Sequence, residues 1–138
     1  MLLIVDASVA VKWIVLEGQR EAALDLLHNQ VLAPDIILAE VRNALLTRVR
    51  RGLSSRQEAA QAEAEFIGLG MTVEPSRDLL SSAFALGLSL EHPIYDCLYL
   101  ALAAERAGTL VTADRRMSEL ARRVPTLAGR VRDLGEPL

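Results

Sequence analysis

Four acidic residues, Asp6, Glu40, Asp96 and Asp114, lie where predicted strands end or in the helices that follow. In a parallel α/β sheet these junctions share one edge, where ligands and catalytic groups collect, so the four side chains are expected to converge. Carboxylates gathered without a cation repel one another and resist ionisation, so such a cluster indicates a bound divalent metal. A metal of the Mg²⁺ type held by carboxylates favours phosphate chemistry.

Each acid also has a purely structural interpretation. Asp6 and Asp114 directly precede predicted helices, where Asp is a good cap for free N–H groups. Glu40 borders the apolar stripe of its helix and could lie at the boundary between the buried and the solvent-exposed face. Asp96 lies in a first helical turn, where the helix dipole favours a negative charge. Its helix, however, is apolar nearly all round, which predicts a buried acid that must be paired or bind metal. We favour the metal cluster, because independent caps explain neither Glu40 nor Asp96.

Length and composition bound the class of protein. At 138 residues the chain is predicted to form one domain, residues 1–138. Hydrophobic residues make up 51% and aromatic residues 4%, so the core must be aliphatic. The single cysteine, Cys97, excludes an internal disulfide framework and a cysteine-based zinc site. The formal charge of −3 argues against a protein that coats nucleic acid nonspecifically. It does not argue against a nuclease, whose metal-binding acids lower the net charge.

No apolar run approaches the length of a membrane span. The apolar start of the chain carries Asp6 and Lys12 and lacks a basic leader, so it predicts a buried strand and helix rather than a signal peptide. A soluble, cytoplasmic protein without a membrane partner is expected. Lys12 is the only lysine, and the arginines gather at 48–51 and 115–123. These clusters are either phosphate contacts or solvated helix faces.

Hydrophobic periodicity predicts strands that alternate with helices. The strands are expected at 2–5, 31–33, 71–73 and 109–112, with an edge strand at 124–127 or 131–134. The helices are expected at 7–14, 19–29, 34–51, 54–67, 78–88, 94–108 and from 114 onward. Pro34 is predicted at the first position of its helix and Gly52 at its end. This order predicts a three-layer αβα fold with a parallel central sheet of four to five strands.

Four stretches in this order resemble the PIN-domain ribonucleases and are similar in sequence to the VapC toxins of bacterial toxin–antitoxin pairs. They are VDASVAVKW (5–13), PDIILAEVRNAL (34–45), HPIYDCLYLALAAERAG (92–108) and LVTADRRM (110–117). The resemblance spans the whole chain, with residues 53–90 matching only in helical character. It implies a PIN-like fold that binds Mg²⁺ or Mn²⁺ mainly through Asp6 and Asp96, supported by Asp114 and Glu40. Polar residues around that pocket are implied to be Ser8, Asn43 and Thr112.

The same resemblance implies endonucleolytic cleavage of RNA by a homodimer. It also implies inhibition by a small cognate antitoxin, which threads a helical segment along the toxin and places a basic side chain at the acids. Neither histidine is a well-placed base, since His28 is expected on a solvent-facing helix and His92 to be structural. Metal-activated water is therefore expected to attack, giving 5′-phosphate and 3′-hydroxyl products.

Phosphotransfer enzymes and non-catalytic binding modules are the two rival classes of function. A phosphotransfer enzyme of the haloacid-dehalogenase type needs an acid where this chain has Ser8, and a response-regulator receiver needs a lysine after a late strand. Neither pattern fits. The remaining alternative is a PIN-like module that binds an antitoxin or RNA without cleaving it.

Overall fold

Five parallel strands form one sheet with the order β3-β2-β1-β4-β5, and the computed structural model describes all residues from 1 to 138. The strands are β1 (Leu2–Val5), β2 (Gln30–Pro34), β3 (Val73–Glu74), β4 (Thr109–Thr112) and β5 (Val131–Asp133). The parallel sheet was predicted and is confirmed. Of the two candidates for the edge strand, the later one is correct, and Pro125–Leu127 is a short 3-10 turn instead.

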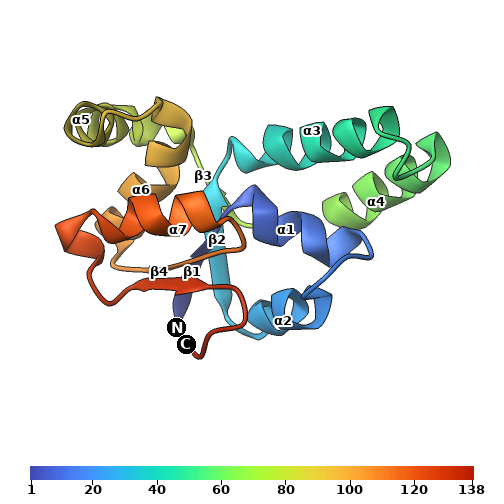
Figure 1. Cartoon of the computed structure of the whole chain (residues 1–138), viewed down its shortest axis with the longest axis horizontal. Coiled ribbons are helices and arrows are strands. Elements are labelled where there is room, and N and C mark those ends of the chain that lie inside the picture. Colours follow the sequence, from blue (N-terminus) through green and yellow to red (C-terminus); the bar gives the residue numbers. More distant parts are fainter.

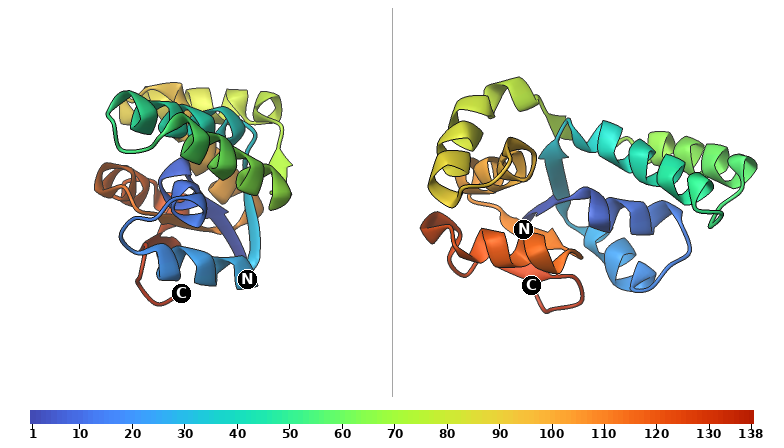
Figure 2. Two further views of the ribbon diagram at one scale, coloured as in Figure 1. Left: turned by 90° about the vertical axis from the view of Figure 1, so that its right-hand side faces the viewer. Right: turned by 45° about the horizontal axis from the view of Figure 1, so that its top comes forward.

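Seven α-helices flank the sheet and complete the predicted three-layer αβα arrangement (Figures 1 and 2). They are α1 (Ala7–Ile14), α2 (Arg20–Asp25), α3 (Ile37–Arg50), α4 (Arg56–Gly68), α5 (Leu80–Leu90), α6 (Ile94–Arg106) and α7 (Arg115–Arg122). Helix α6 packs against β1, β2 and β4, whereas α1 packs against α2, α3 and α4. None of these helices is long and apolar enough to cross a membrane.

The chain around Pro34 departs from the prediction. Pro34 is the last residue of β2 rather than the first residue of α3. It pairs in register with Glu74 of β3, and the N–H of Asp35 then donates to the Glu74 carbonyl at 2.8 Å. A proline is tolerated at a strand end, where its missing N–H breaks no internal ladder bond. The start of α3 is therefore delayed to Ile37.

Three other boundaries move by a few residues. The predicted helix at 19–29 divides into α2 and a 3-10 turn at Leu26–His28. The strand expected at 71–73 is reduced to Val73–Glu74, and the helix expected at 78–88 begins two residues later, after a 3-10 turn at Ser76–Asp78.

The core is one continuous cluster of 36 buried apolar residues. It is largely aliphatic, as the composition predicts, and Tyr99 is its largest fully buried side chain. Helix α6 is buried on all sides from Cys97 to Ala103. At its end, Gly108 leads into β4, and a Cβ there would lie 3.1 Å from Cγ1 of Ile4. This close approach fixes α6 against the strand that carries Asp6.

Candidate active site

The carboxyl ends of β1 and β4 lie side by side. Val5 of β1 pairs with Val111 of β4, so the next residues, Asp6 and Thr112, are neighbours although 106 positions separate them. The Thr112 hydroxyl donates to Oδ2 of Asp6 at 2.5 Å. The parallel sheet thus brings together the first and the fourth of the matching stretches, 5–13 and 110–117, at the edge expected for ligands.

Asp6 combines a capping role with an unusual degree of burial. It is the N-cap of α1, and its Oδ1 accepts from the Ser8 hydroxyl at 2.5 Å and from the Val9 N–H at 3.4 Å. Only 8% of the residue is exposed. Burial raises the pKa of the Asp6 carboxyl above its ordinary value, the hydrogen bonds oppose this rise, and the nearby charge of Asp114 adds to it.

Asp114 joins this group through the backbone that follows β4. Its N–H donates to the Thr112 hydroxyl at 3.0 Å, and the neighbouring Ala113 N–H donates to the Ser8 hydroxyl at 2.9 Å. The Asp114 carboxylate caps α7 by accepting from the Arg116 N–H at 2.9 Å. Capping and proximity to Asp6 therefore coexist, and the two interpretations of this acid are not exclusive.

Glu40 reaches the same edge from the first turn of α3. The buried Tyr99 hydroxyl of α6 donates to its Oε1. Burial raises the pKa of Glu40, and the negative charges of Asp96 and Asp6 raise it further. Tyr99 was missed by the sequence analysis. The available signal was its place inside an apolar helix, since a buried tyrosine hydroxyl needs a polar partner.

Asp96 is not buried, and the expectation that it would be was wrong. Its side chain is 47% exposed, because the buried part of α6 begins one residue later, at Cys97. Its Oδ2 lies 2.8 Å from Nε2 of His92, one helical turn earlier. His92 is therefore a structural residue, as expected, but one that orients a candidate ligand.

The remaining polar residues divide between two places. Ser8 and Thr112 contact Asp6, as described above. Asn43, in contrast, is exposed and lines a cavity between α3 and α4 together with Arg42 and Arg50. The structure gives Asn43 no hydrogen bond to the acids, and its role in the pocket stays a prediction.

Comparison with known proteins identifies the family. The profile of the PIN domain matches residues 3–123. This chain belongs to the PIN domain family. It is 34% identical over 123 residues to Ribonuclease VapC3 of Pyrobaculum aerophilum, covering 86% of this chain and 94% of that protein.

Two solved structures share the PIN fold at low sequence identity. The PAE2754 protein of Pyrobaculum aerophilum superimposes with a TM-score of 0.67 at 19% identity, covering 97% of this chain and 90% of that one. VapC20 of Mycobacterium tuberculosis, described as a toxin that cleaves the sarcin–ricin loop, gives 0.60 at 18% identity, covering 85% and 93%. At these identities the likeness concerns the fold alone.

The charges at this edge of the PIN domain fit a cation. No lysine or arginine forms an ion pair with any of the four acids, and His92 is the only basic partner of Asp96. Carboxylates without compensating charge at a partly buried site favour a hard divalent ion, which prefers oxygen ligands. No group of three or more Asp, Glu, His or Cys side chains lies close enough together to hold one ion. Side-chain movement would accompany binding.

Proposed function

We propose that this chain is a metal-dependent endoribonuclease and the toxin of a toxin–antitoxin pair. The observation that carries the proposal is Asp6: a buried carboxylate without a cationic partner, at the edge where Asp114, Glu40 and Asp96 also lie. Membership of the PIN family and the similarity to a protein named Ribonuclease VapC3 support RNA as the substrate. An RNA target also supports action in the cytoplasm.

Asp6 and Asp96, supported by Asp114 and Glu40, would hold Mg²⁺ or Mn²⁺. When bound, such an ion supplies an activated water and neutralises charge on the scissile phosphodiester. The chain's own groups set the positions of the ligands. Ser8 and Thr112 fix the two oxygens of Asp6, the Tyr99 hydroxyl fixes Glu40, and His92 orients Asp96. Partners of this kind raise the precision of a ligand set and are needed for full activity.

No histidine is free to act as a general base at this edge. The His92 ring contacts Asp96, and His28 lies in the turn that precedes β2, at the opposite ends of the strands. An ion held by the acids would supply the activated water, and the expected products carry 5′-phosphate and 3′-hydroxyl ends.

The decisive variants are Asp6→Asn and Asp96→Asn. Each should abolish Mg²⁺-dependent cleavage of RNA while the circular dichroism spectrum remains that of the wild type. Asp133→Asn is the matched control, because Asp133 ends β5 at the same sheet edge but faces Arg122 at 3.7 Å. Normal cleavage by both test variants would overturn the mechanism. RNA binding without any cleavage by the wild type, with Mg²⁺ or Mn²⁺ supplied, would favour the non-catalytic module.

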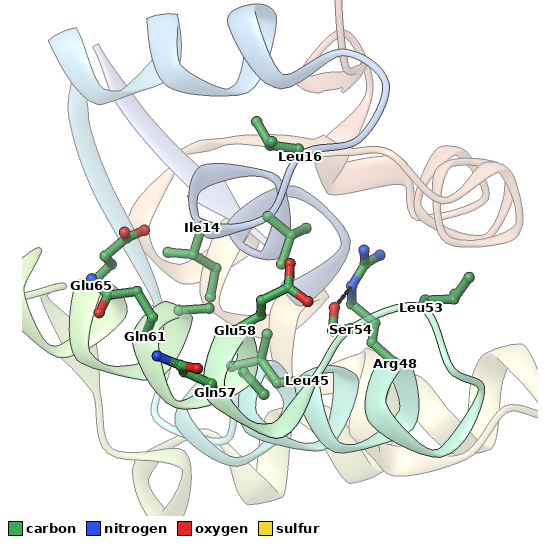
Figure 3. A pocket seen from close by; sticks show the side chains of 13 residues that line it. Ile14, Leu16, Leu45, Arg48, Leu53, Ser54, Gln57, Glu58, Gln61 and Glu65 are labelled. Carbon is green, nitrogen blue, oxygen red and sulfur yellow. Dashed lines mark hydrogen bonds between the residues drawn. The ribbon is translucent and has the colours of Figure 1, made fainter.

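The antitoxin needs a surface on which to dock, and a hollow with a mixed apolar and polar lining lies away from the acids. A hollow of about 640 Å³ lies between the end of α1 and the α3–α4 pair (Figure 3). Its apolar lining includes Ile14, Leu16, Leu45 and Leu53, and the carboxylate of Glu58 also lines it. An amphipathic helix fits such a groove, with its apolar face inward and a basic residue near Glu58. We assign this hollow to the helical segment of the cognate antitoxin.

Helix α5 supports the proposed homodimer. Residues 79–90 carry no charge, and Leu80, Phe84 and Leu88 form an exposed stripe at helical spacing, with Phe84 61% and Leu88 68% exposed. Arg77 and Glu91 stand just beyond the two ends of this helix. Two copies of α5 packed antiparallel across a two-fold axis would cover both stripes and place Arg77 of each near Glu91 of the other.

A further inference from the structure

We propose that Lys12, with the hollow beside Ser8, forms a binding site for a phosphate of the RNA strand one nucleotide away from the cleaved bond. This proposal rests on the proposed function, since it concerns how the substrate is held. It assigns a role to the only lysine of the chain, which the mechanism does not use.

The hollow is continuous with the acidic edge. It measures about 300 Å³ and is lined by α1, the chain after α1, Ala44 of α3 and Ala113 after β4. Ser8 belongs to both places, because its hydroxyl donates to Asp6, accepts from the Ala113 N–H and also lines the hollow. Ala44 follows Glu40 by one helical turn, so the α3 wall also leads directly from the acids.

Lys12 is held in place at this hollow. Its side chain is 14% exposed, and Nζ donates to the Gly18 carbonyl at 2.9 Å and to Oε1 of Glu17 at 3.3 Å. An ammonium group has three N–H donors, so one is left for a ligand. Both partners belong to the segment after α1, and they restrain the long side chain before any ligand arrives.

The local charge favours an anion. Glu17 forms ion pairs with both Lys12 and Arg48, because its Oε2 also lies 3.4 Å from Nη1 of Arg48. Because Glu17 is shared with Arg48, which lies outside the hollow, it compensates the charge of Lys12 only in part. Lys12 and Glu17 are the only charged residues that line the hollow, and the small alanines leave room for a phosphate. A base would instead stack on an aromatic side chain, and none lines the hollow.

The spacing suits a polynucleotide. Ser8 and Lys12 lie four residues apart on one face of α1, about 6 Å along the helix axis. This rise is comparable to the separation of neighbouring phosphates in one strand. A strand whose scissile phosphate lies at Asp6 can therefore follow α1 and present its next phosphate to Lys12. The ammonium also offsets the repulsion between the acids and the RNA backbone.

Substitution of Lys12 by Met tests the site, because Met keeps most of the apolar stem and removes the charge. Cleavage of a single-stranded RNA oligonucleotide should show KM raised about 10-fold and kcat within about 2-fold of the wild type. The slope of log(kcat/KM) against log salt should fall by about 0.7, the value for one phosphate contact on a single strand. Lys12→Arg should restore most of the KM. Unchanged KM and an unchanged salt slope in Lys12→Met would overturn the proposal.

Glu17→Gln separates phosphate binding from a purely structural role. If Lys12 only fastens the segment after α1, loss of its carboxylate partner should reproduce the Lys12→Met defect, and that result would also overturn the proposal. If Lys12 binds phosphate, Glu17→Gln should leave KM equal to or below that of the wild type. A substrate with a neutral methylphosphonate at one position beside the cleaved bond should lose affinity for the wild type but not for Lys12→Met.

Binding of the same oligonucleotide, measured by fluorescence anisotropy with Ca²⁺ in place of Mg²⁺, gives a readout that does not depend on cleavage. Weaker binding by Lys12→Met, by a similar factor of about 10, is the expected result. A wild type that binds RNA through Lys12 but never cleaves would refute the proposed nuclease function and leave this site standing. A wild type that cleaves while Lys12→Met binds and cleaves normally would refute the site alone.

Discussion

Burial of Asp6 predicts how the stability of the metal-free protein depends on pH. Burial raises the pKa of Asp6 and of Glu40 above their ordinary values of 3.8 and 4.5. As the pH rises past these values, the unfolded chain loses both protons first and the folded protein keeps them. The unfolded state then binds fewer protons, so the free energy of unfolding falls with rising pH until the folded carboxyls also ionise.

The magnitude follows from proton linkage. Each group contributes a fall of at most about 1.4 kcal/mol per pH unit within its window. Asp6→Asn removes one of the two contributions and keeps an oxygen that accepts from Val9 and Ser8. Urea unfolding in EDTA from pH 4 to pH 8 should therefore show the variant gaining stability relative to the wild type as the pH rises. Hydrogen bonds with Ser55 lower the pKa of Glu58, so this residue makes the free energy of unfolding rise with pH. The effect is the same in the wild type and in Asp6→Asn.

Added Mg²⁺ completes the test. The ion should stabilise the wild type by about 2.7 kcal/mol at a hundred-fold excess over its dissociation constant, and stabilise Asp6→Asn much less. A difference in stability between the two proteins that stays constant from pH 4 to pH 8 would refute the argument from burial. A flat difference combined with equal stabilisation by Mg²⁺ would leave Asp6 with its capping role only.

Three further substitutions test separate features. Tyr99→Phe removes the donor to Glu40 and should lower the free energy of unfolding by about 1–3 kcal/mol, measured by urea unfolding, with a fall in kcat for RNA cleavage. Phe84→Asp puts a charge on the exposed stripe of α5 and should shift sedimentation from dimer to monomer, whereas Ser89→Asp, on another exposed face of that helix, should not. Ser55→Ala breaks the capping box with Glu58 at the start of α4 and should cost about 1 kcal/mol in thermal or urea unfolding.

The elements with strong local signals were predictable from the sequence. Strand β1 and helix α1 have the bounds expected, because an uninterrupted apolar run is followed by a capping Asp6. The start of α4 was expected at the serine pair, where Ser55 and Glu58 form a capping box. The parallel sheet follows from the alternation of strands and helices, which needs no knowledge of distant contacts.

The predictions failed where contacts with other parts of the fold determine the local structure. Pro34 belongs to β2 because Glu74, forty residues later, pairs with it. Burial of Asp96 was overestimated because helical periodicity describes the middle of α6 and not its first turn, which lies at the rim of the sheet. Tyr99 contacts Glu40, which lies 59 positions earlier in the chain, so only the fold reveals that hydrogen bond. The catalytic roles of the four acids stay a prediction.

Helix α3 has a consequence for regulation. Its first turn carries Glu40, while Leu45 and Arg48, further along the same rigid rod, line the hollow assigned to the antitoxin. A partner seated in that hollow and an ion held at the acids would therefore contact the same helix. Any effect of the partner on the affinity for the ion must, by linkage, be matched by an equal effect of the ion on the affinity for the partner. Any movement of α3 imposed by an inhibitor in the hollow would thus reach Glu40, in addition to the basic side chain that the antitoxin is expected to place at the acids.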